Sequence, residues 1–236
     1  MASRHDARRW SEGLLLLEYV LVGGGDFAIE VASYLKDIHA QSGGEDWRVN
    51  AIVSISEPRI EDFERVLGYR PEVYRQVASL TELKKRIFVI GIGDPAVRQR
   101  AMDEVDAQEG GFGTIIHPRA YVAATATVGV GSIISPYAFV GPFAQVGRNC
   151  ALNVGAIVGH DARLGDCTVL SPGADINGHG RTGRAAFLGA GAIINPKVEL
   201  GSYSKLSAGS VLNKSVGDGF LMHGNPASGR QMIRVP

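Results

Sequence analysis

The hydrophobic positions of this chain follow two different periods, one in each half. After residue 18, the run "YVLVGGG" precedes a segment in which Phe27, Val31, Leu35 and Ile38 recur every three or four residues. This spacing predicts a strand, a glycine turn and a helix. The runs "VNAIVSI" and "IFVIGIG" predict two further strands, and "DPAVRQRAMDEVDAQ" predicts a helix after the second. Together they indicate a small Rossmann-like parallel α/β domain over residues 18–113.

From Ile116 onward the period of the apolar positions is six. Seventeen consecutive hexads follow without an insertion, and sixteen of them begin with Ile, Val or Leu, the exception being Thr182. The fifth position of every hexad is Gly, Ala, Ser, Cys, Thr or Val. One aliphatic and one small residue per six-residue unit is typical of a parallel β-helix, in which each rung buries its apolar side chains by stacking on its neighbours. A flat antiparallel sheet would instead need a period of two. We predict a β-helix domain with a C-terminal tail over residues 114–236.

One hexad, "VGHDAR" at residues 158–163, contains a candidate catalytic pair. Val158 and Ala162 keep the two inward positions, so His160 and Asp161 occupy positions that point away from the core. A neutral imidazole, with an ordinary pKa of about 6.5, is suited to removing a proton from a nucleophile. A carboxylate beside it fixes the tautomer of the ring or stabilises the imidazolium. We predict that His160 is a general base and that Asp161 orients it.

The glycine turn after the first predicted strand has the pattern G-x-G-x-x-A, which lets backbone N–H groups approach a phosphate. A fold that binds a nicotinamide dinucleotide would also need an acidic residue at the end of the second strand. This chain has Ser54, Ser56 and then Glu57 there. The pattern therefore favours a phosphate-containing ligand other than a nicotinamide dinucleotide.

The charge balance of the chain bears on its possible partners. Twenty-four basic residues balance twenty-four acidic ones, so we expect no nucleic-acid partner. Cys150 and Cys167 form no C-x-x-C pair and are expected to be buried thiols in a reducing, cytoplasmic compartment. No apolar run has the length of a membrane span, and no two histidines stand five residues apart as in trimeric zinc β-helix enzymes, so we expect neither a span nor a bound metal. The first dozen residues are expected to be poorly ordered, and His39 to face solvent.

Five motifs occur in the order found in one group of enzymes. These are "LVGGGDFAIEVASYL", "FVIGIGDPAVRQR", "HPRAYV", "VGHDARLGD" and "HGNPAS". Together they resemble the sialic acid O-acetyltransferase and bacillosamine N-acetyltransferase group of hexapeptide-repeat acyltransferases. The resemblance implies a left-handed β-helix with three hexads in each coil, and therefore between five and six coils in this chain. It also implies a homotrimer with active sites between neighbouring subunits.

The resemblance further implies two ligands, acetyl-CoA as co-substrate and a nucleotide sugar. The N–H of Gly178, one coil after His160, would donate to the thioester oxygen. The pantetheine arm would contact the backbone at Gly189, Ala190 and Ala208. Independently of the resemblance, the positive charge and the location of Lys197, Lys214 and Arg230 make them candidate contacts for the coenzyme phosphates, although a solvated surface side chain is the commoner role for such residues. The diphosphate and base of the nucleotide sugar would be bound by Gly23, Gly24, Gly25, Gly91, Gly93 and Asp94.

The expected reaction is N-acetylation of a nucleotide-linked 4-amino sugar, by direct attack of the amine on the thioester, for cell-surface glycan or polysaccharide synthesis. Two alternatives remain open: O-acetylation of sialic acid or another sugar hydroxyl, and a non-catalytic scaffold that binds sugar nucleotides. One branch of the group has a second histidine nine residues after the first, where this chain has Val169. His179, one coil after Asp161, and His223, beside the closing motif, are further candidates for contact with the site.

Overall fold

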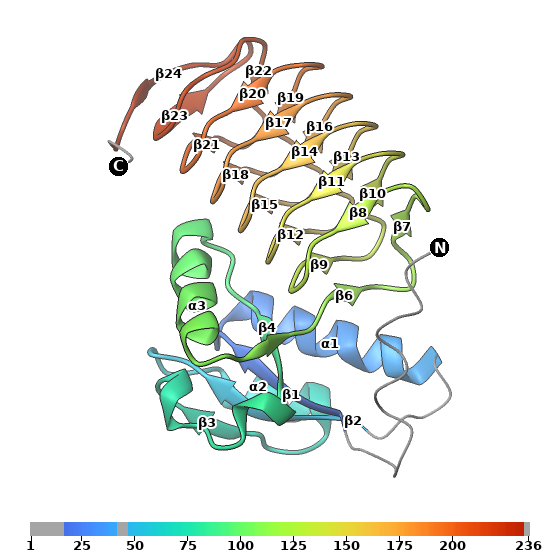
Figure 1. The fold of residues 1–236 in the computed structure, drawn as a ribbon, viewed down its shortest axis with the longest axis vertical. Helices are drawn as coiled ribbons and strands as arrows, with labels where there is room; N and C mark the ends of the chain where they lie inside the picture. The colour runs from blue at the N-terminus through green and yellow to red at the C-terminus, as the bar shows by residue number, and fades with distance from the viewer. Residues whose placement is uncertain (1–16, 42–46, 234–236) are drawn as a thin grey trace. The chain divides into compact units, whose positions relative to one another are not determined.

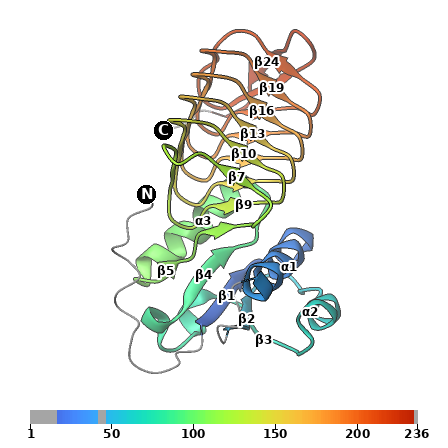
Figure 2. The same ribbon diagram turned by 90° about the vertical axis from the view of Figure 1, so that its right-hand side faces the viewer.

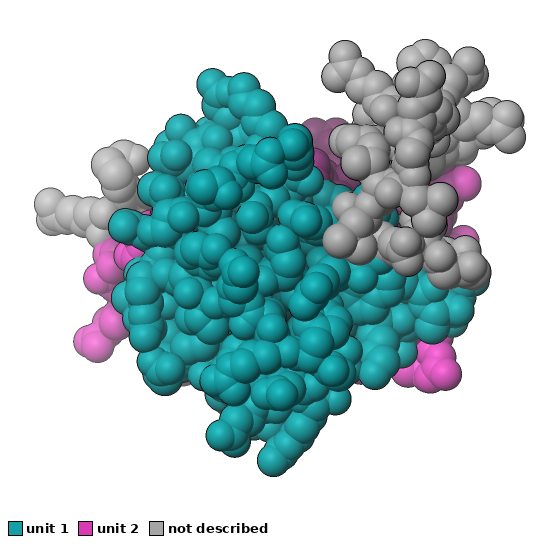
Figure 3. All heavy atoms as spheres, turned by 90° about the horizontal axis from the view of Figure 1, so that it is seen from below, with its two compact units in different colours: residues 1–91, 105–111 teal, residues 92–104, 112–236 magenta. Residues whose placement is uncertain are grey.

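The computed structural model describes residues 17–41 and 47–233, so the expectation for the first dozen residues lies outside the described part. The chain divides into two compact units, coloured separately in Figure 3. The first comprises residues 1–91 and 105–111, and the second comprises residues 92–104 and 112–236. No helix among the described residues is long and apolar enough to cross a membrane.

The first half of the chain forms a five-stranded sheet in the order β3-β2-β1-β4-β5, with α1 and α2 on the same side of it (Figure 2). Strand β1 pairs in parallel with both β2 and β4, as predicted for a Rossmann-like fold. The strands are β1 Leu17–Val22, β2 Trp47–Val53, β3 Glu72–Tyr74, β4 Ile87–Ile90 and β5 Gly111–Phe112. The helices are α1 Asp26–Gln41, α2 Ile60–Leu67 and α3 Pro95–Ala107, with 3-10 turns at Val77–Ser79 and Leu83–Lys85.

The expectation that His39 faces solvent is wrong. Its side chain lies at the end of α1 and is only 5% exposed. The ring stacks on Trp47 with centroids 4.8 Å apart, and its Nε2 lies 3.2 Å from the hydroxyl of Tyr19. Strands β1 and β2 supply these aromatic partners, and the periodicity of the helix alone contains no information about them.

The second half forms the predicted β-helix, whose coils are seen stacked in Figure 1. From β6 to β19, each rung is a strand of two residues that pairs in parallel with the strand 18 residues further on. One coil is therefore three hexads, as the resemblance implies. The first sheet contains β6 Ile115–Ile116, β9 Ile133–Ile134, β12 Ala151–Leu152, β15 Val169–Leu170, β18 Phe187–Leu188 and β21 Lys205–Leu206, followed by β23 Phe220–His223 and β24 Ser228–Gln231. The second contains β7 Tyr121–Val122, β10 Phe139–Val140, β13 Ile157–Val158, β16 Asp175–Ile176, β19 Ile193–Ile194 and β22 Val211–Leu212. The third contains β8 Thr127–Val128, β11 Gln145–Val146, β14 Arg163–Leu164, β17 Arg181–Thr182 and β20 Glu199–Leu200.

The core of the β-helix consists of the first and fifth positions of the hexads. From Ile134 to Leu212, every residue at the first position is buried, including the exceptional Thr182. The Thr182 hydroxyl lies 3.0 Å from that of Thr168, a fifth-position residue that also donates to the carbonyl of Gly183. The polar exception is therefore hydrogen-bonded inside the core, which removes most of the cost of burying it.

The corners of the β-helix use the fourth position of the hexads for a left-handed backbone conformation. Nine non-glycine residues with φ between 49° and 65° occupy it: Tyr137, Phe143, Asn149, Asp161, Cys167, His179, Ala185, Lys197 and Tyr203. This conformation is unfavourable for residues other than glycine, asparagine and aspartate, so the stacked coils must hold it in place. The backbone from which each corner side chain projects is consequently held in place by the neighbouring coils.

Glycine at the second position allows neighbouring coils to approach closely. A Cβ atom on Gly165 would lie 2.5 Å from the carbonyl carbon of Gly183, in the next coil. A Cβ on Gly147 would likewise lie 2.9 Å from the carbonyl carbon of Gly165. Since the obstacle in each case is backbone, a side chain at these positions would force the coils apart.

Arg98 of α3 is fully buried within the second unit, which the sequence pattern does not indicate. Its guanidinium donates to the carbonyl oxygens of Ile92, Asn149 and Cys150. Burial lowers its pKa to about 10, so the group is still charged at neutral pH. A buried cation without hydrogen-bond partners would be strongly destabilising. The contacts of Arg98 therefore hold α3 against the β-helix coil that contains Asn149.

Both cysteines are free thiols buried inside the second unit, as expected. Burial raises the pKa of Cys150 and of Cys167 to about 12. At pH 8 only about one such thiol in ten thousand is ionised, and the thiolate is the reactive form. We expect neither cysteine to react with a thiol-specific reagent in the native protein and both to react after unfolding. Rapid labelling of either residue before unfolding would contradict the buried environment.

Candidate active site

The predicted catalytic pair lies at a corner of the β-helix, between β13 and β14. Asp161 takes the left-handed position of its hexad, with φ of 60°, and its N–H donates to Pro142 of the preceding coil. The carbonyl of His160 accepts from the N–H of His179 in the following coil. The side chains of His160 and Asp161 are 61% and 41% exposed. The corner thus presents both side chains to solvent on a backbone that is hydrogen-bonded to the coils on either side.

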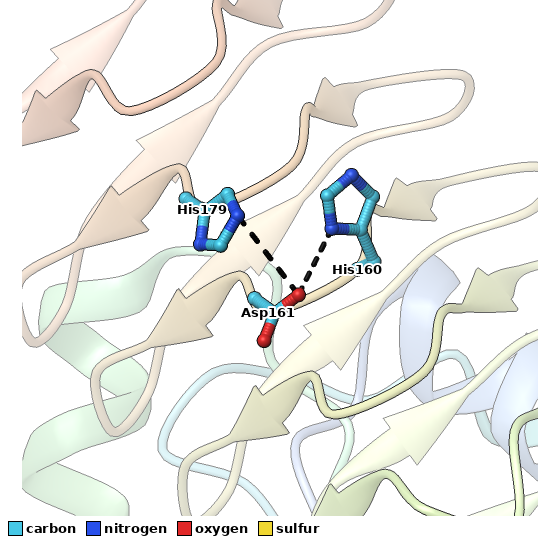
Figure 4. A group of neighbouring side chains, drawn as sticks. All are labelled: His160, Asp161 and His179. Atoms are coloured by element: carbon cyan, nitrogen blue, oxygen red, sulfur yellow. Dashed lines mark hydrogen bonds and ion pairs between the residues drawn. The ribbon is translucent and has the colours of Figure 1, made fainter.

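His160 and Asp161 contact each other as a base and its orienting carboxylate would. The Nδ1 atom of His160 lies 2.9 Å from Oδ2 of Asp161 (Figure 4). An Nδ1–H that donates to the carboxylate leaves the lone pair of the neutral ring on Nε2. The atom available to accept a proton is therefore Nε2.

Gly178 lies directly beside this nitrogen, one coil further on. A Cβ atom built on Gly178 would lie 2.4 Å from Nε2 and 2.7 Å from Cε1 of His160, so only glycine leaves room for the ring. Among the described residues, the Gly178 N–H donates to no other group. Acyl transfer requires a hydrogen-bond donor for the negative oxygen of the tetrahedral intermediate, and the unpaired N–H of this residue is a candidate for it.

His179 approaches the same carboxylate from the next coil. Its Nε2 lies 4.0 Å from Oδ2 of Asp161, and its ring stands nearly perpendicular to that of His160, with centroids 5.2 Å apart. Figure 4 shows Asp161 between the two imidazoles. The sequence contains the signal for this contact, because His179 follows Asp161 by one full coil of 18 residues at the same hexad position.

Two hollows on the second unit bring together other candidate residues. One has a volume of about 330 Å³ and is lined by His179, Arg181, Lys197, Glu199 and Ser215. The other, of about 490 Å³, is lined by Leu221, His223, Ser228, Gly229 and Arg230. Of the three candidate phosphate contacts, Lys197 lines the first hollow together with His179, and Arg230 lines the second together with His223. Lys214 lines neither hollow.

The predicted pantetheine contacts lie close together on adjacent coils. A Cβ atom on Gly189 would lie 2.5 Å from the backbone nitrogen of Ala208. The carbonyl of Ala190 accepts a hydrogen bond from Gly209. The three residues therefore lie together at one corner of the β-helix, with Gly189 buried and with Ala190 and Ala208 exposed.

The glycines of the first unit divide into packed and open ones. A Cβ on Gly24 would lie 2.6 Å from Cβ of Pro58, and a Cβ on Gly91 would lie 2.7 Å from Cα of Ala28, so both glycines permit close packing. Gly25 has open space on its side-chain face. The carbonyl of Gly25 accepts from Ala28, so helix α1 begins directly at the turn.

Gly93 and Asp94 belong to the second unit. Gly93 has open space beside it. Asp94 is the N-terminal cap of α3, because its Oδ1 accepts from the N–H groups of Ala96 and Val97, and its Oδ2 lies 3.4 Å from Nζ of Lys205. Asp94 thus has a structural task, and a part in substrate binding remains a prediction.

No model of a known protein family matches the sequence, and no curated protein does either. Among solved structures, perosamine N-acetyltransferase from Caulobacter crescentus, in complex with CoA and GDP-perosamine, has a TM-score of 0.78 and 28% identity, and the match covers 90% of this chain and 97% of that one. Two further structures of that enzyme, in which one histidine is replaced by asparagine or by alanine, are also complexes with CoA and GDP-perosamine.

Two more distant solved structures show the same fold. The acetyltransferase domain of PglB from Neisseria gonorrhoeae FA1090, in complex with acetyl coenzyme A, has a TM-score of 0.77 and 23% identity, and the match covers 90% of this chain and 98% of that one. WeeI from Acinetobacter baumannii AYE has a TM-score of 0.75 and 20% identity, with 91% and 100% covered. The predicted left-handed β-helix after an α/β region is confirmed, as is the resemblance to hexapeptide-repeat sugar acetyltransferases.

Proposed function

We propose that this protein is an acetyl-CoA-dependent N-acetyltransferase that acetylates the amine of a nucleotide-linked 4-amino sugar. One observation is the main support: Nε2 of His160, whose ring is held by Asp161, lies directly beside Gly178, whose N–H is unpaired within the described residues. A base and an oxyanion donor at one spot are the two groups that direct acyl transfer needs.

In the proposed reaction the sugar amine attacks the thioester carbonyl. The new N–C bond forms as the Nε2 of His160 accepts the proton of the amine, and the imidazolium is stabilised by Asp161. The Gly178 N–H donates to the oxygen of the tetrahedral intermediate. The C–S bond then breaks, and the sulfur of CoA receives the proton from His160. The buried Cys150 and Cys167 take no part, so no acyl-enzyme forms on them.

The likeness to the Caulobacter perosamine N-acetyltransferase supports both proposed substrates. That enzyme is solved with CoA and with GDP-perosamine, a nucleotide-linked amino sugar, and 28% of the residues are identical over 90% of this chain. Its histidine-replaced forms also bind both molecules in crystals.

We assign the ligands to the backbone positions predicted from the sequence. The diphosphate of the nucleotide sugar is proposed to bind at the turn Gly23–Gly24–Gly25, where Gly25 is open and α1 begins, because the N-terminus of a helix attracts anions. Gly91, whose N–H donates to Val22, supports that turn by packing on α1. The pantetheine arm is proposed to follow the corner at Gly189, Ala190 and Ala208.

A homotrimer with its active sites between subunits is part of the proposal, as is a cytoplasmic location. An exposed apolar row on the second sheet of the β-helix supports the trimer. Tyr121 and Phe139 stack with centroids 5.0 Å apart and are 56% and 39% exposed, and Ile157 extends the row. Burial of such a row between subunits would be favourable. The molar mass in solution checks this, with three times 25.1 kDa expected.

The acceptor distinguishes the proposed function from its alternatives. Purified protein is incubated with acetyl-CoA and, separately, with nucleotide-linked 4-amino sugars, their hydroxyl analogues and free sialic acid, while release of CoA is measured. We expect turnover with one of the nucleotide-linked amino sugars. Turnover on hydroxyl acceptors alone would identify an O-acetyltransferase. Tight binding of a sugar nucleotide with no CoA release from any acceptor would identify a scaffold.

A further inference from the structure

We propose that His160, Asp161 and His179 bind a divalent transition-metal ion of the Zn²⁺ type, and that this binding switches off the base. The three side chains come from two consecutive coils of the β-helix and converge on one point (Figure 4). Each offers one ligand atom, and the three atoms lie within 4.8 Å of one another. They are the two imidazole nitrogens and one oxygen of the carboxylate between them.

The spacing of the ligand atoms fits a metal ion after small side-chain rotations. Nδ1 of His160 and Nε2 of His179 lie 2.9 Å and 4.0 Å from Oδ2 of Asp161. In a tetrahedral zinc site with bonds of about 2.1 Å, neighbouring ligand atoms are about 3.4 Å apart. The observed distances bracket that value. The backbone is already in place, since Asp161 and His179 occupy equivalent left-handed corner positions with φ of 60° and 59°.

The chemistry and exposure of the three side chains also suit such an ion. Two imidazoles and one carboxylate form a ligand set that zinc and other borderline metals accept, with further positions open to water. The side chains are between 41% and 61% exposed, so a hydrated ion can reach them. Glu199 lines the neighbouring hollow with Arg181 and Lys197. Repulsion from these two cations is expected to lower the affinity for a metal ion.

Metal binding would remove the function proposed for His160. The ion takes the lone pair of Nδ1, so the single proton of the neutral ring must reside on Nε2. A protonated Nε2 cannot accept the proton of the attacking amine. Inhibition should therefore lower kcat and should not be relieved by raising either substrate concentration. The inhibition rests on the proposed function, whereas the binding of metal does not.

The test separates binding from catalysis. Zn²⁺ is titrated calorimetrically into untagged, chelator-treated protein without substrates, and in parallel the loss of acetyltransferase activity and its recovery with a chelator are measured. We expect one Zn²⁺ ion per chain, and an affinity at least about tenfold lower in His179→Gln, since that variant lacks one ligand. His179→Gln should also require correspondingly more Zn²⁺ for inhibition. His223→Gln, which removes a different exposed histidine, should leave the affinity unchanged.

Two results would overturn the proposal. One is equal zinc affinity in wild-type protein and His179→Gln, which would place the ion elsewhere. The other is tight binding at this site with full activity. If no acceptor is ever found, the titrations of the wild-type protein and the two variants still decide whether the metal site exists, so failure of the proposed function is distinguishable from failure of the metal site.

Discussion

Replacing His160 by alanine should lower kcat by about a hundredfold or more, the range that a positioned general base contributes. The reason is the proposed role of its ring: Nδ1 lies 2.9 Å from Oδ2 of Asp161, so Nε2 is the atom proposed to accept the proton of the attacking amine. KM for both substrates should change much less, since the proposed ligand contacts are backbone groups elsewhere. Release of CoA at saturating acetyl-CoA and acceptor measures the effect.

Two controls keep this result interpretable. The His160 side chain is 61% exposed, so its removal should leave the thermal unfolding temperature and the affinity for CoA nearly unchanged. Asp161→Asn should have an intermediate effect, because the base remains but its tautomer is no longer enforced. If His160→Ala retained kcat within about threefold of wild type, the rate-limiting proton transfer would not involve this residue.

The β-helix could be predicted from the sequence because its contacts are nearly one-dimensional. Each residue packs on those 18 positions before and after it, so arithmetic on the hexads gives spatial neighbours directly. The neighbours His160 and Gly178 follow from this rule, and so does His179 above Asp161. The core position of Thr182 followed too, although its hydroxyl partner Thr168 required the structure.

The rest of the fold depends on contacts that no local period encodes. The burial of Arg98 arises from carbonyl groups about 50 residues away, at Asn149 and Cys150. The burial of His39 likewise depends on Trp47 in the neighbouring strand. The outward position of the hexad is another example, because Ile133 and Val169 are buried there whereas Phe139 is exposed. Which face of a β-helix is covered depends on the tertiary structure around it.

Replacing Gly178 by alanine should also lower kcat by about a hundredfold, comparable to the loss of one oxyanion donor. The added Cβ would lie 2.4 Å from Nε2 of His160, a distance that the ring must relieve by moving away. The new methyl group also lies beside the N–H proposed to bind the thioester oxygen. A single methyl group therefore displaces the base and hinders the approach of the thioester to the oxyanion donor. Steady-state release of CoA measures the loss of kcat.

The fold should tolerate this change, because the obstructing atoms are the end of a mobile side chain. Gly159→Ala is the contrasting variant: its Cβ would lie 2.8 Å from the backbone nitrogen of Gly178 and should lower the unfolding temperature markedly. Gly217→Ala, whose Cβ meets nothing closer than 4.0 Å, is the matched silent control.

The double variant His160→Ala, Gly178→Ala separates the two effects at Gly178. Without the imidazole, the new methyl group has space, so any loss caused by displacing the base disappears from the comparison with His160→Ala alone. A double variant as active as His160→Ala would mean that Gly178 acts only by making room for the ring. A further drop of about tenfold or more would mean that the methyl group also obstructs the approach of the thioester to the Gly178 N–H, and this is the outcome we expect. If Gly178→Ala alone kept full kcat, the reaction would take place away from this corner.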